Sequence, residues 1–164
     1  MKKIITIIAA MTLAALTTVA LTSCAQKDSS SESWSVSDAW VRVTAPKQTN
    51  SAAYMKITVS EDDVLTNVSV PSSIAARAEL HETTKPMDTM SMETNPTEMH
   101  NMVGMRQVSS IKVPAAGGIR LEPGGFHIMI MDLVKPIKLD ELVPLTLTFR
   151  KAGKVKVEAS ASEN

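Results

Sequence analysis

The residues best suited to hold a metal ion lie in one short segment, His127-Ile128-Met129-Ile130-Met131. On a β-strand alternate side chains share a face, so the histidine and the two methionines are expected to point one way and the isoleucines the other. The isoleucines are enough to pack against a hydrophobic core, which does not require the imidazole or the thioethers. The alternative interpretation is a strand buried on both faces, in which methionine fills irregular gaps.

A second histidine and another methionine extend this candidate site. In the predicted strand 74–82, Ala78 and Leu80 form an apolar face, and His81 lies on the opposite face. Met105 comes shortly before another predicted strand and is a further candidate ligand. The chain has only three histidines, and two of them lie near strand ends beside methionine-rich segments. These residues together predict a site of two histidines and two methionines.

Two imidazoles and two thioethers form a ligand set of low charge. Thioethers are neutral, soft and polarisable, and among common biological metals they favour Cu(I), whereas carboxylates suit Ca²⁺ and Mg²⁺. A blue-copper electron-transfer site needs a cysteine thiolate within the domain, and zinc sites prefer thiolate, imidazole and carboxylate ligands. The single cysteine, Cys24, lies in the N-terminal segment. The ligand types therefore predict a site for Cu(I).

The composition argues against other classes of function. The 17 basic and 17 acidic residues cancel, so the net charge gives no support for binding to nucleic acid. No activated nucleophile, general base or phosphate-binding loop is evident in the sequence. We therefore predict that the protein is not an enzyme.

The first 23 residues have the features of a bacterial lipoprotein signal peptide. Two lysines precede an uncharged run from Ile4 to Gln26, which is long enough to leave a membrane-spanning anchor as an alternative. The motif Leu21-Thr22-Ser23-Cys24 resembles a lipobox, in which the cysteine is lipidated and becomes the mature N-terminus. We expect a signal peptide over 1–23 and a lipidated Cys24 with a polar tether over 24–34. The protein would then lie in the cell envelope, anchored to the outer side of the cytoplasmic membrane or periplasmic.

Residues 35–160 are expected to form one all-β domain, followed by a short tail over 161–164. The clearest pattern is at the C-terminal end, where apolar and polar residues alternate over 145–150 and again over 155–159. Similar short segments, separated by turns rich in Pro and Gly, predict strands at 40–44, 53–59, 64–70, 74–82, 111–113 and 119–122. Several short strands with regular turns are typical of a β-sandwich or barrel.

Residues 83–101 differ from the rest of the domain. This segment contains two prolines and many Thr and Asn residues, so we expect a long loop between strands. It is either a surface insertion or a second, flexible arm that captures copper. The auxiliary candidate ligands in and around it, together with one on the strand of the main site, are Met87, Met90, Met92, Met99, His100, Met102 and Met131.

The mature chain resembles the PCuAC family of extracytoplasmic copper(I) chaperones. The segments that carry the resemblance are Asp38–Arg42, Ala52–Met55, Glu79–Glu82, Met105-Arg106, Pro114–Gly118, Pro123–Met129 and Leu145–Phe149. In this family a His and a downstream Met are followed, after a fixed interval, by His-x-Met. The pattern maps onto His81, Met105, His127 and Met129, with 21 residues between the second and third of these.

One departure from the family concerns the first interval. Twenty-three residues separate His81 from Met105, more than is usual in the family, and the methionine-rich segment fills the excess. Met102 is therefore the nearest competitor of Met105 as a ligand.

The resemblance implies a cupredoxin-like Greek-key β-sandwich that holds Cu(I) outside the cytoplasm and transfers it to an acceptor. The usual acceptor in this family is the copper centre of cytochrome c oxidase, or an assembly factor that serves it. Two alternatives stay open from the sequence. The protein could be a copper-sequestering or resistance lipoprotein without a dedicated partner, or a metal-free structural or adhesion lipoprotein.

Overall fold

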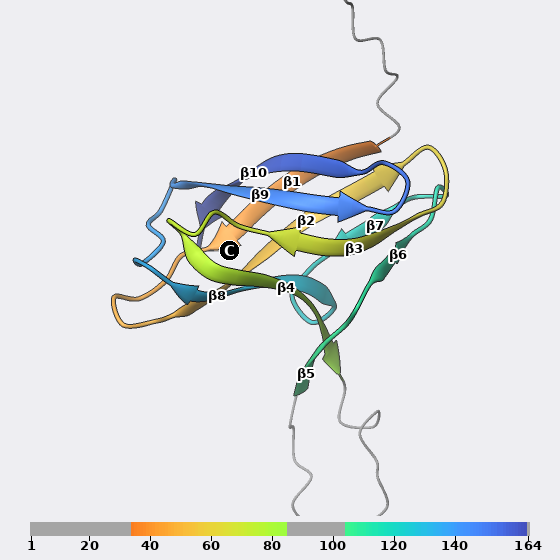
Figure 1. Cartoon of the computed structure of the whole chain (residues 1–164). Helices are drawn as coiled ribbons and strands as arrows, with labels where there is room; N and C mark the ends of the chain where they lie inside the picture. The colour runs from red at the N-terminus through yellow and green to blue at the C-terminus, as the bar shows by residue number, and fades with distance from the viewer. Residues whose placement is uncertain (1–33, 85–103, 164) are drawn as a thin grey trace, which may run out of the picture.

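The structure is a computed structural model that describes residues 34–84 and 104–163. Within these ranges every element of regular structure is a β-strand, and no helix could cross a membrane (Figure 1). The all-β class predicted from the sequence is thus confirmed. The ten strands are β1 (Trp34–Arg42), β2 (Asn50–Val59), β3 (Asp63–Ser69), β4 (Ala75–Thr84), β5 (Gly104–Gln107), β6 (Ile111–Val113), β7 (Ile119–Leu121), β8 (Phe126–Leu133), β9 (Leu142–Phe149) and β10 (Lys154–Ser162).

The strands form one continuous hydrogen-bonded path in the order β5-β4-β8-β2-β1-β10-β9-β3-β6, and β7 also pairs with β2. The first strand joins the two halves of this path, since it is antiparallel to β2 and parallel to β10. The path bends back on itself, so that β3 comes into contact with β4 (Figure 1). The hydrophobic core lies inside this curve, and the outer face of β4, β8 and β2 points away from it.

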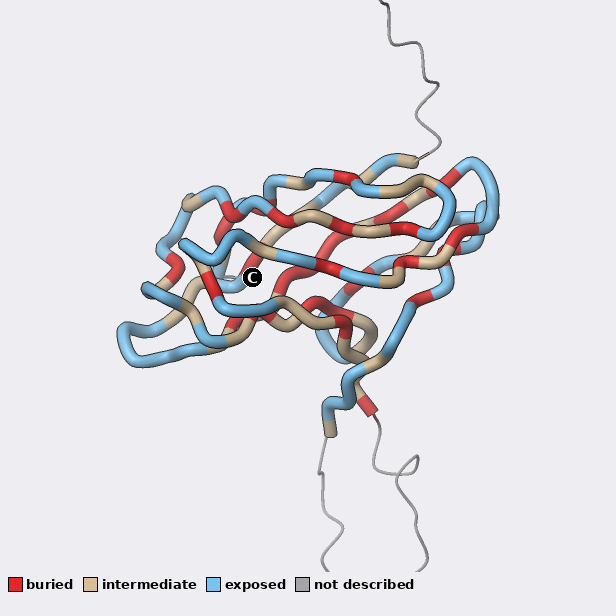
Figure 2. The backbone as a smooth tube through the Cα atoms, viewed as in Figure 1, coloured by how far each residue is buried: buried red, intermediate tan, exposed pale blue. Residues whose placement is uncertain are grey.

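Alternation of apolar and polar residues explains why these segments form strands with one face in the core. In β9, Leu145, Leu147 and Phe149 are buried, while Thr146 and Thr148 between them are partly exposed (Figure 2). The β9–β10 hairpin predicted from this pattern is confirmed. The largest fully buried side chains are Met55, Ile57, Leu65, Ile111, Leu121, Ile128, Ile130, Leu145 and Leu147.

Several predicted boundaries differ from the observed ones. The strand predicted to end at residue 82 continues through Thr83 and Thr84, because both residues pair with β5. Met105 precedes the predicted strand 111–113, now β6, but it also lies within the short strand β5. This strand was not predicted, since its polar sequence has no alternating pattern. Trp34 pairs with Val59 of β2, and β10 continues to Ser162, beyond the strand predicted at 155–159.

Other expectations concern residues outside the described ranges. These are the signal peptide, the lipidated cysteine, nearly all of the tether, and the remainder of the methionine-rich segment.

A buried carboxylate fastens the β9–β10 turn to the start of β3. Asp63 is only 6% exposed, and its carboxylate oxygens accept backbone N–H groups from Val64 (2.7 Å), Lys151 (3.0 Å) and Ala152 (2.9 Å). Burial alone would raise the pKa of this carboxyl, but the three N–H donors and the Lys151 ammonium together lower it from its ordinary value of 3.8.

Replacing this carboxylate is expected to destabilise the domain. We predict that Asp63→Asn lowers the free energy of unfolding by about 2–3 kcal/mol near neutral pH, because N–H groups lose a charged acceptor. Because the folded pKa is lowered, the stabilisation is fully present above the unfolded pKa and is lost as the pH falls through the folded value. Urea denaturation of Asp63→Asn and of the original chain should therefore show a difference in the free energy of unfolding. This difference is constant above about pH 5 and shrinks below about pH 4.

The matched control is Glu158→Gln on β10, where the carboxylate is exposed and no ion pair is recorded among the described residues. This variant should unfold like the original chain. A difference in the free energy of unfolding between Asp63→Asn and the original chain that is the same at about pH 6 and about pH 3 would contradict this role of the Asp63 carboxylate.

Candidate metal centre

The predicted ligands lie on one face of three neighbouring strands. His81 on β4 stands directly opposite His127 on β8, and Met129 follows two residues later on the same face of β8. On the other side of β4, Met105 on β5 stands opposite Thr83, which shares a strand face with His81. The order β5-β4-β8 therefore brings together residues that are far apart in the chain.

The opposite face of β8 belongs to the core. Ile128 and Ile130 are completely buried, which confirms the apolar face expected from the sequence. Met129 and Met131 on the other face are only partly buried, so β8 is not buried uniformly on both faces. This strand therefore separates the core from the candidate site.

The two histidines lie close together, with 6.0 Å between ring centroids. His127 is only 2% exposed, and its Nδ1 donates to the carbonyl oxygen of Gly125 at 3.0 Å. Because this carbonyl can only accept, the neutral His127 ring carries its proton on Nδ1 and has an unprotonated Nε2. That Nε2 atom is buried and has no hydrogen-bond partner among the described residues.

The second ring has the opposite arrangement of its nitrogens. His81 Nε2 donates to Glu79 Oε2 at 3.0 Å, which leaves Nδ1 unprotonated in the neutral ring. This Nδ1 atom is likewise buried and unpartnered in the described part of the chain. A ring held through one nitrogen, with the other nitrogen free, is the usual arrangement of a metal-binding histidine.

A chain of charged groups anchors the partner of His81. The other carboxylate oxygen of Glu79 accepts from Arg77 Nε at 3.1 Å, and Arg77 Nη1 pairs with Asp132 Oδ2 at 2.9 Å. Residues 77, 79 and 81 share a face of β4, as the alternation in the sequence indicated. Glu79 is thus held in place on both sides, which restricts the orientation of the imidazole.

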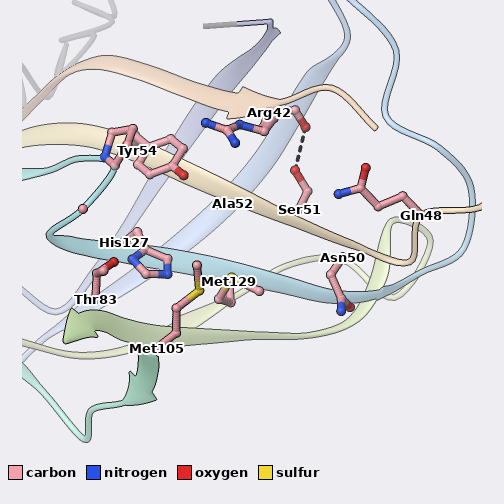
Figure 3. Close-up of a pocket in the computed structure, with 12 residues that line it drawn as sticks. Arg42, Gln48, Asn50, Ser51, Ala52, Tyr54, Thr83, Met105, His127 and Met129 are labelled. Carbon is pink, nitrogen blue, oxygen red and sulfur yellow. Dashed lines mark hydrogen bonds between the residues drawn. The ribbon is translucent and has the colours of Figure 1, made fainter. Parts of the chain in front are cut away.

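Met105, His127 and Met129 line a pocket of about 320 Å³, and Figure 3 shows Met105 pointing toward the other two. The Met105 side chain is 61% exposed, so it lies at the mouth of the pocket. The other residues that line the pocket are Arg42, Gln48, Asn50, Ser51, Ala52, Tyr54, Thr83, Pro123 and Gly124.

An aromatic residue covers one side of His127 and was not assigned to the site from the sequence. The Tyr54 ring is 6.3 Å from the His127 ring and 4.4 Å from the Trp40 ring, measured between centroids. Tyr54 is buried like its neighbours Ala53 and Met55 on β2, and only the pairing of β2 with β8 places it beside the histidine.

The auxiliary candidates do not join this pocket as far as the structure describes them. Met131 shares the strand face with Met129, but it stands opposite Arg77 and Asn50, further along β8, and does not line the pocket. The remaining auxiliary candidates, and the predicted lipidation site at Cys24, lie outside the described residues; they are Met87, Met90, Met92, Met99, His100 and Met102.

No group of three or more His, Cys, Asp or Glu side chains gathers into a metal site within residues 34–84 and 104–163. The arrangement described above instead combines two imidazole nitrogens with two thioethers. Such a set suits a soft metal ion.

Comparison with known proteins identifies the relatives of this chain. The sequence profile of the LpqE-like family, "Putative lipoprotein LpqE-like", matches residues 34–101 and 94–161. A relative from Leifsonia xyli subsp. xyli (strain CTCB07), "Putative lipoprotein Lxx21020", is 30% identical over 135 residues, which cover 79% of this chain and 73% of the relative.

Solved structures show the same fold. The apo PCuAC domain from PmoF1 matches with a TM-score of 0.60 at 22% identity, covering 80% of this chain and 95% of that domain. DR1885 from Deinococcus radiodurans matches in its apo form with a TM-score of 0.58 at 27% identity, covering 98% of this chain and 97% of that one. The Cu(I) form of DR1885 matches with a TM-score of 0.54 at 26% identity, covering 77% of this chain and 76% of that one.

The resemblance stated from the sequence is thus confirmed by both comparisons. The chain belongs to the LpqE-like family of lipoproteins, and its β-strand domain has the fold of the PCuAC copper-binding domains.

Proposed function

We propose that the protein is an extracytoplasmic chaperone that binds Cu(I) through His81, Met105, His127 and Met129. The observation that carries this proposal is a pair of buried, unpartnered nitrogens, His127 Nε2 in a pocket lined by two thioethers and His81 Nδ1 on the neighbouring strand. A buried nitrogen without a partner costs about 1–3 kcal/mol, and a bound metal ion would remove that cost. The Cu(I) form of DR1885 supports copper as the metal.

The ligand set fits a monovalent soft ion on grounds of charge. An imidazole that coordinates a metal ion is neutral and a thioether carries no charge, so a Cu(I) site of two of each would carry about one positive charge in total. The hydrogen bonds of the two rings leave His81 Nδ1 and His127 Nε2 as the coordinating atoms. The two histidines would therefore bind through different ring nitrogens.

The position of Met105 favours transfer rather than permanent storage. The histidines are held by neighbouring groups, whereas Met105 is largely exposed on the edge strand β5. A ligand group of an acceptor protein could replace this thioether first and then the inner ligands in turn. Such stepwise exchange avoids a free copper ion.

The remaining parts of the proposal concern location and acceptor. Lipidation of Cys24 would attach the domain to the cell envelope, on the outer side of the cytoplasmic membrane or in the periplasm, as the family of lipoproteins supports. The acceptor we propose is a copper-accepting protein of the respiratory oxidase, either the subunit of cytochrome c oxidase that holds copper or its assembly factor. The protein would act by metal transfer, without enzyme activity.

Copper titration tests the ligand assignment. We expect the mature chain carrying Cys24→Ser to bind one Cu(I) tightly in competition with a chromophoric chelator. His127→Ala should weaken the binding by about 100-fold or more, since a buried ligand is lost and its neighbours stay unpartnered. The matched control is Met131→Leu, which changes a methionine on the same strand face outside the pocket and should leave the affinity unchanged.

Three results of this titration would separate the alternatives. Unchanged stoichiometric binding after simultaneous replacement of all four proposed ligands would overturn the site. More than one bound copper, reduced to one by deletion of residues 85–103, would favour a sequestering lipoprotein. Absence of Cu(I) binding would favour a metal-free structural or adhesion protein.

The role of Glu79 is tested separately. Glu79→Gln is expected to weaken Cu(I) binding by about 10-fold, because the partner that orients His81 is lost from the hydrogen-bond network. Long-range ¹H–¹⁵N NMR of the apo protein, in the neutral state of the rings, should show His81 protonated at Nε2 and His127 at Nδ1.

The control for the affinity measurement is Glu82→Gln on the same strand, because the Glu82 carboxylate pairs with Arg106 at 2.7 Å and not with a histidine. Equal effects of the two variants on affinity would refute a specific role for Glu79.

Delivery to the oxidase is tested in cells. Deleting the gene should lower cytochrome c oxidase activity at limiting copper, and the original gene should restore it while His127→Ala should not. The comparison requires that membrane fractions contain equal amounts of the original protein and of His127→Ala. Oxidase activity that does not change on deletion would argue against the proposed acceptor and leave the copper site itself unaffected.

A further inference from the structure

The pocket beside the proposed copper ligands has a second, chemically different side. Arg42 at the end of β1, Gln48 in the following loop and Asn50 at the start of β2 line it together with His127 and Met129. We call these three residues the donor wall. Figure 3 shows Arg42 and Gln48 on the side of the pocket opposite Met105.

The hydrogen bonds of the donor wall leave mainly N–H groups available. Gln48 Oε1 accepts from the backbone N–H of Ala45 at 3.4 Å, and Asn50 Oδ1 accepts from that of Asp132 at 3.3 Å. Both side-chain amides therefore have their oxygens occupied and their NH₂ groups free to donate, since the described residues provide no partner for them. A guanidinium has donors only.

Arg42 also differs from most other arginines of the described chain in its charge environment. Arg77, Arg106 and Arg120 each lie within 4.0 Å of a carboxylate, whereas Arg42 forms no ion pair among the described residues. Its backbone is fixed, because Ser51 Oγ donates to the Arg42 carbonyl oxygen at 2.6 Å. No carboxylate lines the pocket beside it in the described part of the chain.

A positive group surrounded by further donors selects an anion, and a carboxylate can accept several of these N–H groups at once. The pocket volume of about 320 Å³ is at the lower end for sites of small organic ligands and far exceeds the space of one metal ion. It can therefore hold a small molecule beside a copper ion bound to the histidines and methionines.

We propose that the pocket receives Cu(I) as a complex with a small thiol-carboxylate, whose carboxylate docks on the donor wall. This inference rests on the proposed copper site and names the form in which the metal arrives. The thiolate is a soft ligand of Cu(I), and the carboxylate pairs with Arg42 and the two amides. One molecule thus matches both sides of the pocket.

The transfer is a ligand exchange without oxidation or reduction. Bonds from copper to the imidazole nitrogens and thioether sulfurs form as the copper–thiolate bond breaks. The released thiolate takes a proton from water, and the thiol-carboxylate leaves the pocket. Copper stays as Cu(I) throughout.

The test compares two copper donors that differ only at the carboxyl group, 3-mercaptopropionate, which is charged there, and its methyl ester, which is neutral. The mature chain with Cys24→Ser receives Cu(I) from each thiol complex, and the rate of transfer is followed by Trp and Tyr fluorescence. We expect transfer from the carboxylate to be about three- to fivefold faster than from the ester, the range for an exposed ion pair. In Arg42→Gln the ratio of the two rates should fall to about one, because the ion pair with the donor carboxylate is lost.

The ratio within each variant removes any general effect of the substitution on copper affinity. The matched control is Arg150→Gln, an arginine that also forms no ion pair among the described residues but lies beside Asp62 and Asp63, away from this pocket. It should keep the full ratio. A ratio that persists in Arg42→Gln, or that is absent from the original chain while copper still binds, would overturn the inference alone. Failure to take up copper from either donor would instead overturn the proposed function.

Discussion

The register between β4 and β8 is the constraint on which the candidate site depends. It sets His81 directly opposite His127 and brings the two rings to 6.0 Å between centroids. A slip of one residue would turn the side chains of one strand to the opposite face and would carry its histidine into the core. Leu80, Ile128 and Ile130 on the inner face are buried in that core and hold the register. The packing that stabilises the domain therefore also positions the two imidazoles.

Hydrogen bonding then distinguishes the two nitrogens of each ring. Each ring donates one hydrogen bond, His81 to Glu79 and His127 to the Gly125 carbonyl. The other nitrogen of each ring is buried and has no partner among the described residues. The structure thus tolerates two unsatisfied polar atoms in the same place, although such atoms are rare in folded proteins and each reduces stability. Their occurrence on two rings only 6.0 Å apart, one of them lining the pocket, is the reason to regard this place as a binding site rather than as part of the packing.

The pocket combines groups of different mobility and charge. The histidines are enclosed and held by neighbours, while Met105 on an edge strand is largely exposed. Across the pocket lies the positive charge of Arg42, and no Asp or Glu of the described residues lines the pocket. In the proposed function, the enclosed ligands would retain the metal ion and the exposed one would allow its exchange with an acceptor.

The sequence by itself determined the all-β class, the core face of β8 and the chemical types of the candidate ligand atoms, because alternation and side-chain chemistry are local properties. It did not reveal β5, since that strand forms only by pairing with the extended end of β4. Tertiary structure alone decided which strands are neighbours, which nitrogen of each ring is free, and that Tyr54 and Arg42 border the pocket. These facts follow from pairing between segments far apart in the chain, and no local pattern encodes that pairing.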